Sequence, residues 1–204
     1  MAALFEWIER IQSYENTANN WDYMTQLKLF VDRGGQDLKF IDVVSSLVAR
    51  GCDEAHCSTQ PIPFIEQRRR NFEVLIYDIF DIQSNMNVLS TSDSTNQENP
   101  PYNYEYMEKY IQSKRSKIEG NIFVSQNEAL DGTPYFSTEY RFNSFILALR
   151  SSALYGLVAN KKFFLGDVSQ GLRGFHAGLF NLVVFLANVK VESIAKDSCD
   201  EVSF

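Results

Sequence analysis

Hydrophobic residues recur at steps of three and four along most of the chain, and the pattern is clearest between Ser137 and Lys190. Such spacing places apolar side chains on one side of a helix, where they face a core. This stretch therefore predicts two apolar-faced helices joined by a short loop that contains glycine. Their stripes consist of Phe142, Phe145, Leu149, Ala153 and Leu157 in the first helix, and of Leu172, Phe175, Leu179, Leu182, Leu186 and Val189 in the second.

The earlier part of the chain predicts shorter helices with recognisable ends. Asn20 and Asp37 are residue types that favour the N-cap position, so we expect a helix to follow each of them. Gly34 and Gly51 are placed to end those two helices, as glycine commonly does. The apolar periods predict helices over about residues 4–11, 21–33, 38–50, 64–82 and 102–119, then an irregular stretch with a short strand at 122–124, and finally the pair of helices that begins at Ser137.

These elements predict an all-α or mainly α fold, a helical bundle of about six or seven helices with one long polar loop. The loop is residues 90–101, STSDSTNQENPP, which contains no apolar residue before its two final prolines. It separates an N-terminal helical part, residues 1–89, from a C-terminal helical part, residues 102–204. We expect both parts to form one compact domain, since a chain of 204 residues fits a single domain.

The chain is acidic, with 26 Asp and Glu against 19 Lys and Arg and a formal net charge of -7. This charge repels a phosphate backbone unless it is segregated, and it suits a basic protein partner. The N-terminus has no basic leader, and the longest late uncharged run, Gly174–Val189, has 16 residues. A membrane-spanning helix needs about 20 apolar residues. We therefore expect a cytoplasmic protein that does not bind a membrane.

Three cysteines, Cys52, Cys57 and Cys199, make an odd number, which argues against a disulfide framework. Cys52, His56 and Cys57 are residue types that bind zinc, but a tetrahedral site needs a fourth ligand. Cys199 or His176 would supply that ligand only if the fold brought it near. We expect these cysteines to be thiols of a loop or of the core, and we expect no metal or other cofactor. A zinc site at Cys52, His56 and Cys57 is the alternative.

Arg50 is followed by His56 after five intervening residues. This spacing resembles the Arg-x(4–6)-His element of HEPN ribonucleases, and the segment from Thr138 to Val158 is similar in texture to helices of HEPN-like proteins. The resemblance implies a helical protein that cleaves RNA without a metal. In that mechanism Arg50 would stabilise charge on the phosphate and His56 would move a proton.

Three successive arginines, Arg68, Arg69 and Arg70, lie on the helix that follows Pro63. They would be able to meet a phosphate or an acidic partner. Glu66 and Glu73 lie three or four residues from these arginines, so ion pairs on a solvated helix face are the structural interpretation. A nucleic-acid site at Arg68–Arg70 remains the alternative.

We expect structural roles for the other polar and aromatic residues of the C-terminal half. Tyr102, Tyr104, Tyr106 and Tyr110 are able to stack on bases, but without basic neighbours we expect them to pack in the core. We expect His176 to be a hydrogen-bonded structural histidine. The glycines of the last helix, Gly171, Gly174 and Gly178, do not follow the dinucleotide-binding pattern, and we expect them to permit close packing or to begin the helix.

The sequence contains no GxxxxGK[ST], HExxH or GxSxG motif. We therefore interpret the protein as a non-enzymatic protein-interaction module, such as an adaptor, inhibitor, immunity factor or regulatory subunit. Its expected contact region is the acidic N-terminal surface together with the loop Ser90–Pro101. The last two helices would also be able to form a homodimer. The ribonuclease with Arg50 and His56 and the nucleic-acid-binding protein with Arg68–Arg70 are the alternatives.

Overall fold

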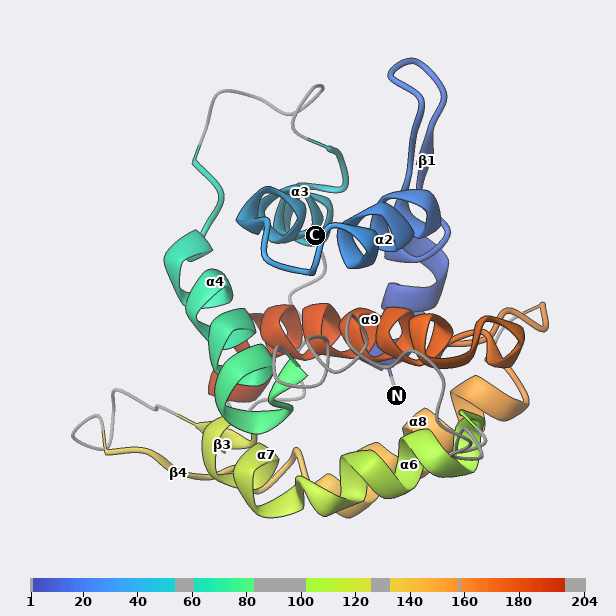
Figure 1. Cartoon of the computed structure of the whole chain (residues 1–204). Helices are drawn as coiled ribbons and strands as arrows, with labels where there is room; N and C mark the ends of the chain where they lie inside the picture. The colour runs from blue at the N-terminus through green and yellow to red at the C-terminus, as the bar shows by residue number, and fades with distance from the viewer. Residues whose placement is uncertain (1, 54–60, 83–101, 126–132, 158, 197–204) are drawn as a thin grey trace.

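A long helix, α9 (Gly171–Glu192), runs through the centre of the molecule in a computed structural model of the chain (Figure 1). The structure describes residues 2–53, 61–82, 102–125, 133–157 and 159–196. Every residue of α9 from Gly174 to Asn188 is buried. A helix that is buried on all sides is a core helix, not a surface helix with one apolar face. The predicted stripe is confirmed at Phe175, Leu179, Leu182 and Leu186, but burial extends beyond it to the other sides of the helix.

The N-terminal elements cover one side of α9. α2 and α3 lie beside it in Figure 1, and both pack against it. The elements in this part are α1 (Ala2–Glu6), the π-helical turn η1 (Trp7–Ile11), the antiparallel strands β1 (Glu15–Asn16) and β2 (Trp21–Asp22), α2 (Tyr23–Asp32) and α3 (Leu38–Arg50).

The ends of α2 and α3 follow capping chemistry. The Asp37 carboxylate accepts a hydrogen bond from the Lys39 amide at 3.0 Å, and Gly51 closes α3 in the left-handed region at φ 76°. Both caps confirm the sequence expectation. The expected cap at Asn20 is wrong, because Asp22 accepts from the Thr25 amide at 2.7 Å and begins α2 instead.

The middle of the chain supplies α4 and then a second group of helices on the opposite side of α9 (Figure 1). The helix predicted over 102–119 is interrupted at Lys114, which has a non-helical backbone. The elements are α4 (Ile65–Glu73), its π-helical continuation η2 (Val74–Ile79), α6 (Tyr104–Ser113), α7 (Arg115–Asn121), and the antiparallel strands β3 (Val124–Ser125) and β4 (Tyr135–Phe136).

The helix before α9 is shorter than its apolar pattern predicts. α8 (Phe142–Leu154) does not begin at Ser137, whose hydroxyl accepts from the Tyr140 amide at 2.7 Å in a separate turn. The connection to α9 is also longer than the expected short loop. It runs from residue 155 to residue 170 and ends in the short 3-10 helix η4 (Val168–Gln170), and a second one, η5 (Ile194–Lys196), follows α9.

This connection lies very close to the first turns of α9. A Cβ atom placed on Gly174 would lie 2.0 Å from the carbonyl oxygen of Asp167, and one on Gly178 would lie 2.0 Å from the carbonyl carbon of Leu165. Both neighbours are backbone atoms, so a side chain at either glycine would displace the segment. The expectation that these two glycines permit close packing is confirmed.

The mainly α fold class is confirmed, since the structure is 66% helical and 6% strand. Its eight α-helices among the described residues compare with the six or seven expected. The polar loop 90–101 lies outside the described residues. One continuous hydrophobic cluster contains buried residues from both halves of the chain, among them Leu27, Phe72, Ile111, Leu149 and Leu182.

Within the described part of the chain, the stretch Val168–Lys196 is long and apolar enough to cross a membrane by length and composition. Of its most apolar window, 83% is buried inside the protein. The core helix of a soluble protein passes the same test, and α9 has neighbours on all sides.

We expect Leu149→Asp to unfold the protein, because Leu149 is buried in the cluster and a carboxylate there would lose its hydration. That cost is comparable with the total stability of a small domain, about 5–15 kcal/mol. Far-ultraviolet circular dichroism during urea unfolding measures it. Leu147→Asp, on the exposed side of the same helix, is the control and should unfold within about 1 kcal/mol of the wild type. A cooperatively folded Leu149→Asp variant would contradict this packing.

Candidate functional site

Two asparagines on the central helix form hydrogen bonds with the elements around it. The first is Asn181. Its side-chain oxygen accepts from Trp7 Nε1 at 3.1 Å and from the Tyr23 hydroxyl at 2.7 Å. Its amide nitrogen donates to Gln12 Oε1 at 3.2 Å and to the Phe164 carbonyl at 2.8 Å. All four hydrogen-bonding positions of the carboxamide are therefore used, as burial requires. Burial also raises the pKa of Tyr23, so this hydroxyl remains a donor.

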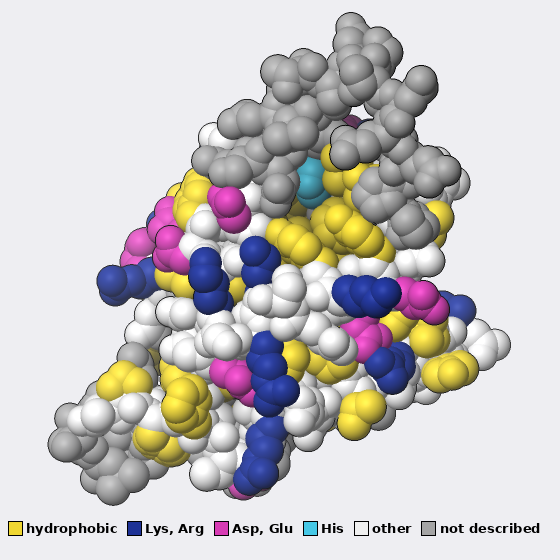
Figure 2. Space-filling model, turned by 60° about the horizontal axis from the view of Figure 1, so that its bottom comes forward, with side chains coloured by type: hydrophobic (Ala, Val, Ile, Leu, Met, Phe, Trp, Pro, Cys, Tyr) yellow, Lys and Arg dark blue, Asp and Glu magenta, His cyan; other side chains and the backbone are white. Residues whose placement is uncertain are grey.

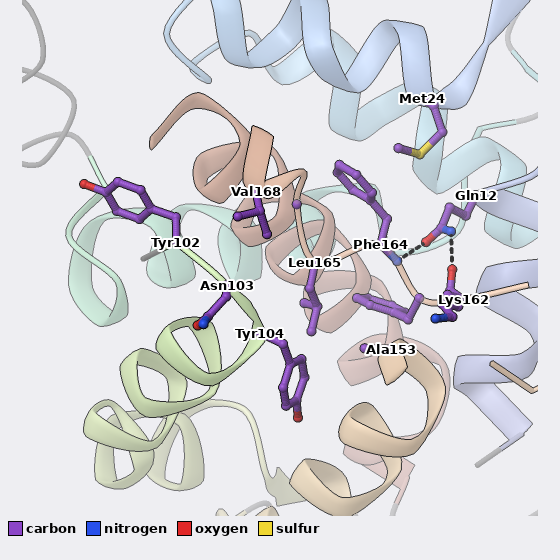
Figure 3. A pocket seen from close by; sticks show the side chains of 12 residues that line it. Gln12, Met24, Tyr102, Asn103, Tyr104, Ala153, Lys162, Phe164, Leu165 and Val168 are labelled. Carbon is purple, nitrogen blue, oxygen red and sulfur yellow. Dashed lines mark hydrogen bonds between the residues drawn. The ribbon is translucent and has the colours of Figure 1, made fainter. Parts of the chain in front are cut away.

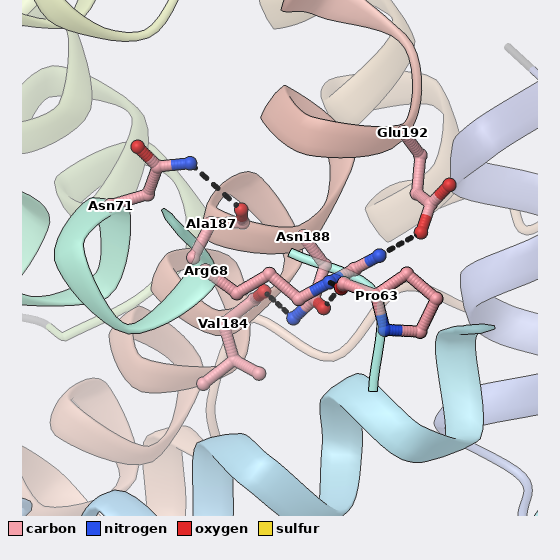
Figure 4. A network of polar contacts seen from close by, with 7 residues as sticks. All are labelled: Pro63, Arg68, Asn71, Val184, Ala187, Asn188 and Glu192. Carbon is pink, nitrogen blue, oxygen red and sulfur yellow. Dashed lines mark hydrogen bonds and ion pairs between the residues drawn. The ribbon is translucent and has the colours of Figure 1, made fainter. Parts of the chain in front are cut away.

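The second is Asn188, two turns further along α9, which accepts a hydrogen bond from the buried Arg68 (Figure 4). The Arg68 side chain is 1% exposed, and its Nη1 donates to Asn188 Oδ1 at 2.7 Å. Its Nε donates to the Pro63 carbonyl at 3.2 Å, and Nη2 forms an ion pair with Glu192. This arginine holds α4 against α9 and does not face solvent.

The other two arginines of the triplet have different surroundings. Arg69 makes a bidentate ion pair with Asp42 of α3, at 2.7 Å for both bonds, and a further pair with Glu66 at 2.7 Å. These carboxylates raise the pKa of Arg69. Arg70 is exposed and forms no ion pair with any described residue. The structure therefore presents one arginine, not three, to an external phosphate.

The residues of the ribonuclease hypothesis are only partly placed. Arg50 is the last residue of α3, while His56 lies outside the described residues, as do Cys57 and Cys199. Asp53, close by, is buried, and its carboxylate accepts from Asn19 at 2.5 Å and from Asn16 at 3.2 Å. These bonds attach the end of the Arg50 segment to the β1–β2 hairpin.

The expectation that Cys52 is a free thiol is wrong. Its sulfur belongs to a disulfide whose partner is not among the described residues. A disulfide sulfur is not the thiolate that a zinc site needs. Disulfides are typical of oxidising compartments, whereas the sequence alone led us to expect free thiols in a cytoplasmic protein. Elsewhere in the described chain, no three His, Cys, Asp or Glu residues lie together as a metal would require.

Tyrosines of α6 and of the residues just before it pack around Phe175 of α9. The ring centroids of Tyr102, Tyr106 and Tyr110 lie 5.6, 5.4 and 5.5 Å from the centroid of Phe175. The expectation of core packing is confirmed for these three tyrosines, which are partly buried against the hydrophobic cluster. The neighbouring His176 is 2% exposed, and burial lowers its pKa to about 4. Its imidazole makes no hydrogen bond within the described part of the chain, so the expected partner is not found there.

A pocket of about 360 Å³ lies between the start of α6, the end of α8 and the connection that precedes α9 (Figure 3). Its lining is mostly apolar and includes Met24, Tyr104, Ala153, Phe164, Leu165 and Val168. Gln12 fixes one wall, because it donates to the Lys162 carbonyl at 2.7 Å and accepts from the Phe164 amide at 2.9 Å. The polar side chains among the described lining residues are those of Gln12, Tyr102, Asn103, Tyr104 and Lys162. A mostly apolar pocket with a few polar groups is typical of a ligand-binding site.

The outward side of α8 is the second candidate, and here apolar side chains face solvent. Leu147 is 60% exposed, Leu154 is 38% exposed and Tyr155, directly after the helix, is 75% exposed. Leu147 and Leu154 are separated by two helical turns and therefore lie on the same side. Figure 2 shows hydrophobic side chains scattered among Lys, Arg, Asp and Glu on one face of the molecule. We call Leu147, Leu154 and Tyr155 the α8 face.

Charge on the α8 face is almost absent. The sole charged residue within α8 is Arg150, whose Nε donates to Glu108 Oε2 of α6 at 3.0 Å, and the guanidinium lowers the pKa of that carboxyl. Asn143, Ser144 and Ser151 complete this side of the helix. An exposed helix side of this kind is suited to a protein partner, because apolar contact area is available without stripping water from unpaired charges.

The chain matches no protein-family model, and comparison with curated proteins and with solved structures gave no match either. The pocket and the α8 face are the two candidate sites of this molecule, and neither was found from the sequence. The sequence did contain a signal for the exposed leucines, because they fall outside the apolar stripe of their helix. It contained none for the pocket, which is formed by residues far apart in the chain.

We expect Arg68→Met to destabilise the protein by about 3–5 kcal/mol, because it leaves Asn188 and Glu192 without their buried partner. Urea unfolding of the purified variant measures the loss. Arg70→Met, on the same helix but exposed, is the matched control and should change stability by less than about 0.5 kcal/mol. Equal effects of the two substitutions would show that the Arg68 network is unimportant for folding.

We expect His176 to make the protein less stable in acid. Because its pKa falls to about 4 in the folded state, the unfolded chain binds the proton first. Its contribution is present above about pH 6.5 and is lost as the pH falls towards 4, at up to about 1.4 kcal/mol per pH unit. The free energy of unfolding between pH 7 and pH 4.5 should therefore fall less steeply in His176→Gln than in the wild type. Parallel curves would rule out this role.

Proposed function

We propose that the protein is a non-enzymatic protein-interaction module and that the α8 face is its contact surface. The observation that carries the proposal is the exposure of Leu147, Leu154 and Tyr155 along one side of a rigid helix. Apolar side chains that project from a rigid element are typical anchors of protein interfaces. The adaptor, inhibitor, immunity and regulatory roles considered from the sequence all require such a surface.

The support comes from the contrast between the two C-terminal helices. α9 is buried from Gly174 to Asn188, so its apolar side chains are already covered and none of them is left for a partner. α8 is different, because Phe142, Ile146 and Leu149 enter the core while the α8 face points away from it. This arrangement moves the proposed contact from the acidic N-terminal surface and the loop Ser90–Pro101 to α8.

The side chains beneath the α8 face hold it in place. Ser152 Oγ donates to the Leu149 carbonyl at 2.9 Å, and the Phe163 amide donates to the Ser152 carbonyl at 3.1 Å. Arg115 lies over the Phe142 ring, with its Cζ atom 5.3 Å from the centroid. A partner would therefore meet a pre-organised helix, which lowers the entropic cost of binding.

We expect Leu147→Asp to fold normally and to lose its protein partner. A central interface leucine contributes about 2 kcal/mol, so affinity should fall roughly thirtyfold. Tagged wild-type protein and the variant would capture proteins from extracts of the source organism, and the affinity of any protein lost with the variant would then be measured with purified components. Leu29→Asp on α2, another partly exposed leucine, is the control and should keep the partner.

Two results would contradict the proposal. One is a partner that binds wild type and Leu147→Asp equally. The other is RNA cleavage by the purified protein that disappears in folded Arg50→Ala and His56→Ala variants, since this would make the protein a ribonuclease.

A further inference from the structure

We infer that the pocket beside α6 binds a small aromatic molecule that carries a hydrogen-bond acceptor. This site is separate from the contact surface proposed above, since none of the described lining residues belongs to the α8 face. Its volume of about 360 Å³ lies near the lower end of the range of small-molecule sites, about 300–1,000 Å³. Val168 of the lining is 59% exposed, so the pocket is open to solvent at this residue.

The walls of the pocket are fixed without a ligand (Figure 3). Gln12 holds the connection that precedes α9, because its side-chain nitrogen donates to the Lys162 carbonyl at 2.7 Å and its oxygen accepts from the Phe164 amide at 2.9 Å. The Phe163 amide donates to the Ser152 carbonyl at 3.1 Å, and this bond attaches the same connection to α8. A ligand would therefore enter a preformed site, and its binding would require little ordering of the protein.

The π-helical turn η1 brings Gln12 to this wall. The Gln12 backbone N–H donates to the Trp7 carbonyl, five residues back, at 2.7 Å. In an α-helix these two positions would point to different sides. The wider π-helical turn brings them to one side, where both side chains form hydrogen bonds with Asn181. π-Helical turns are rare and occur frequently at functional sites, so the irregular backbone of η1 supports a binding role for the pocket.

Two aromatic side chains of the lining are available to the ring of a ligand. Tyr104 and Phe164 are half-buried, and neither makes a ring contact with another described residue. Phe163 is different, because its ring packs against Phe185 of the core with the centroids 5.6 Å apart. Aromatic rings favour offset-stacked or edge contacts with other rings beyond the burial of their area. An aromatic ligand would therefore supply the ring partners that Tyr104 and Phe164 do not have among the described residues.

Hydrogen-bond donors of the lining select an acceptor. Asn103 is the N-cap of α6, since its Oδ1 accepts from the Tyr106 amide at 3.0 Å, and its side-chain N–H groups have no acceptor among the described residues. Gln12 uses one N–H of its side chain for the Lys162 carbonyl and keeps a second. Lys162 also lines the pocket and is exposed, and its ammonium makes no ion pair with a described residue. A carbonyl or carboxylate oxygen on the ligand would match these donors.

Four probes of similar size test the inference: 2-naphthamide, 2-naphthoate, 2-naphthylmethylammonium and the saturated acid decalin-2-carboxylate. NMR titrations with the full-length protein give their dissociation constants. We expect 2-naphthamide and 2-naphthoate to bind with dissociation constants below about 1 mM. The ammonium probe should bind at least about tenfold more weakly, because it has no acceptor. The saturated acid should bind about threefold more weakly than 2-naphthoate, because it has no aromatic ring.

Asn103→Asp separates recognition from folding. Aspartate is as favourable an N-cap as asparagine, so α6 should keep its first turn, but the substitution removes the donor and adds a negative charge. We expect 2-naphthoate to bind at least about tenfold more weakly, and the ammonium probe to bind more tightly than it does to the wild type. Asn143→Asp, the same change at an exposed position of α8 outside the lining, is the matched control and should change both constants by less than about twofold.

Ala153→Leu tests the place of binding. Ala153 is a half-buried lining residue near the end of α8, and leucine is a good helix former whose larger side chain would occupy part of the pocket. We expect the variant to fold and to bind 2-naphthoate at least about tenfold more weakly. Leu147→Asp should bind 2-naphthoate like the wild type, because Leu147 is not among the described lining residues. The pocket and the α8 face are thereby tested independently.

Four results would overturn the inference. The first is that neither 2-naphthamide nor 2-naphthoate binds below about 1 mM. The second is that the ammonium probe or the saturated acid binds as tightly as 2-naphthoate. The third is that folded Ala153→Leu binds 2-naphthoate like the wild type. The fourth is an equal effect of Asn103→Asp and Asn143→Asp on the two charged naphthalene probes, since the preference would then come from net charge alone.

Discussion

The burial of α9 on every side is the constraint on which the rest of the structure depends. A helix without a solvent face leaves no place for an unsatisfied polar group, so Asn181 and Asn188 require partners from other elements. Those partners are residues of η1, α2 and α4, which the asparagines therefore hold in position. Close approach of the preceding segment requires glycine at positions 174 and 178.

This arrangement also determines where apolar side chains reach the surface. α9 is covered, and the large apolar side chains exposed in the described C-terminal half lie on other elements: Phe136 on β4, Leu147 and Leu154 on α8, Tyr155 directly after α8, and Val168 on η4. The pocket near Phe164 is the other candidate site, and its wall depends on Gln12 and so on the same Asn181 network. The central helix thus supports the pocket, although its own residues from Gly174 to Asn188 are all buried.

Local features were predictable from the sequence, and long-range ones were not. The Asp37 cap, the Gly51 terminus and the buried position of Leu149 depend on neighbouring residues in the chain, and all three were found. Arg68 was expected on a solvated face, because its partner Asn188 is 120 residues away in sequence. The pocket had no sequence signal for the same reason. The extent to which α9 is buried was underestimated, because periodicity does not reveal how many neighbours a helix has.

Hydrogen exchange of backbone amides in aqueous buffer tests the central position of α9 most directly. The account predicts that amides from Gly174 to Asn188 exchange most slowly and only when the whole protein unfolds, while those of α6 and the β1–β2 hairpin exchange faster. Fast exchange of the α9 amides under conditions in which α6 is protected would contradict the account, and so would a protein that remains folded only in detergent or lipid.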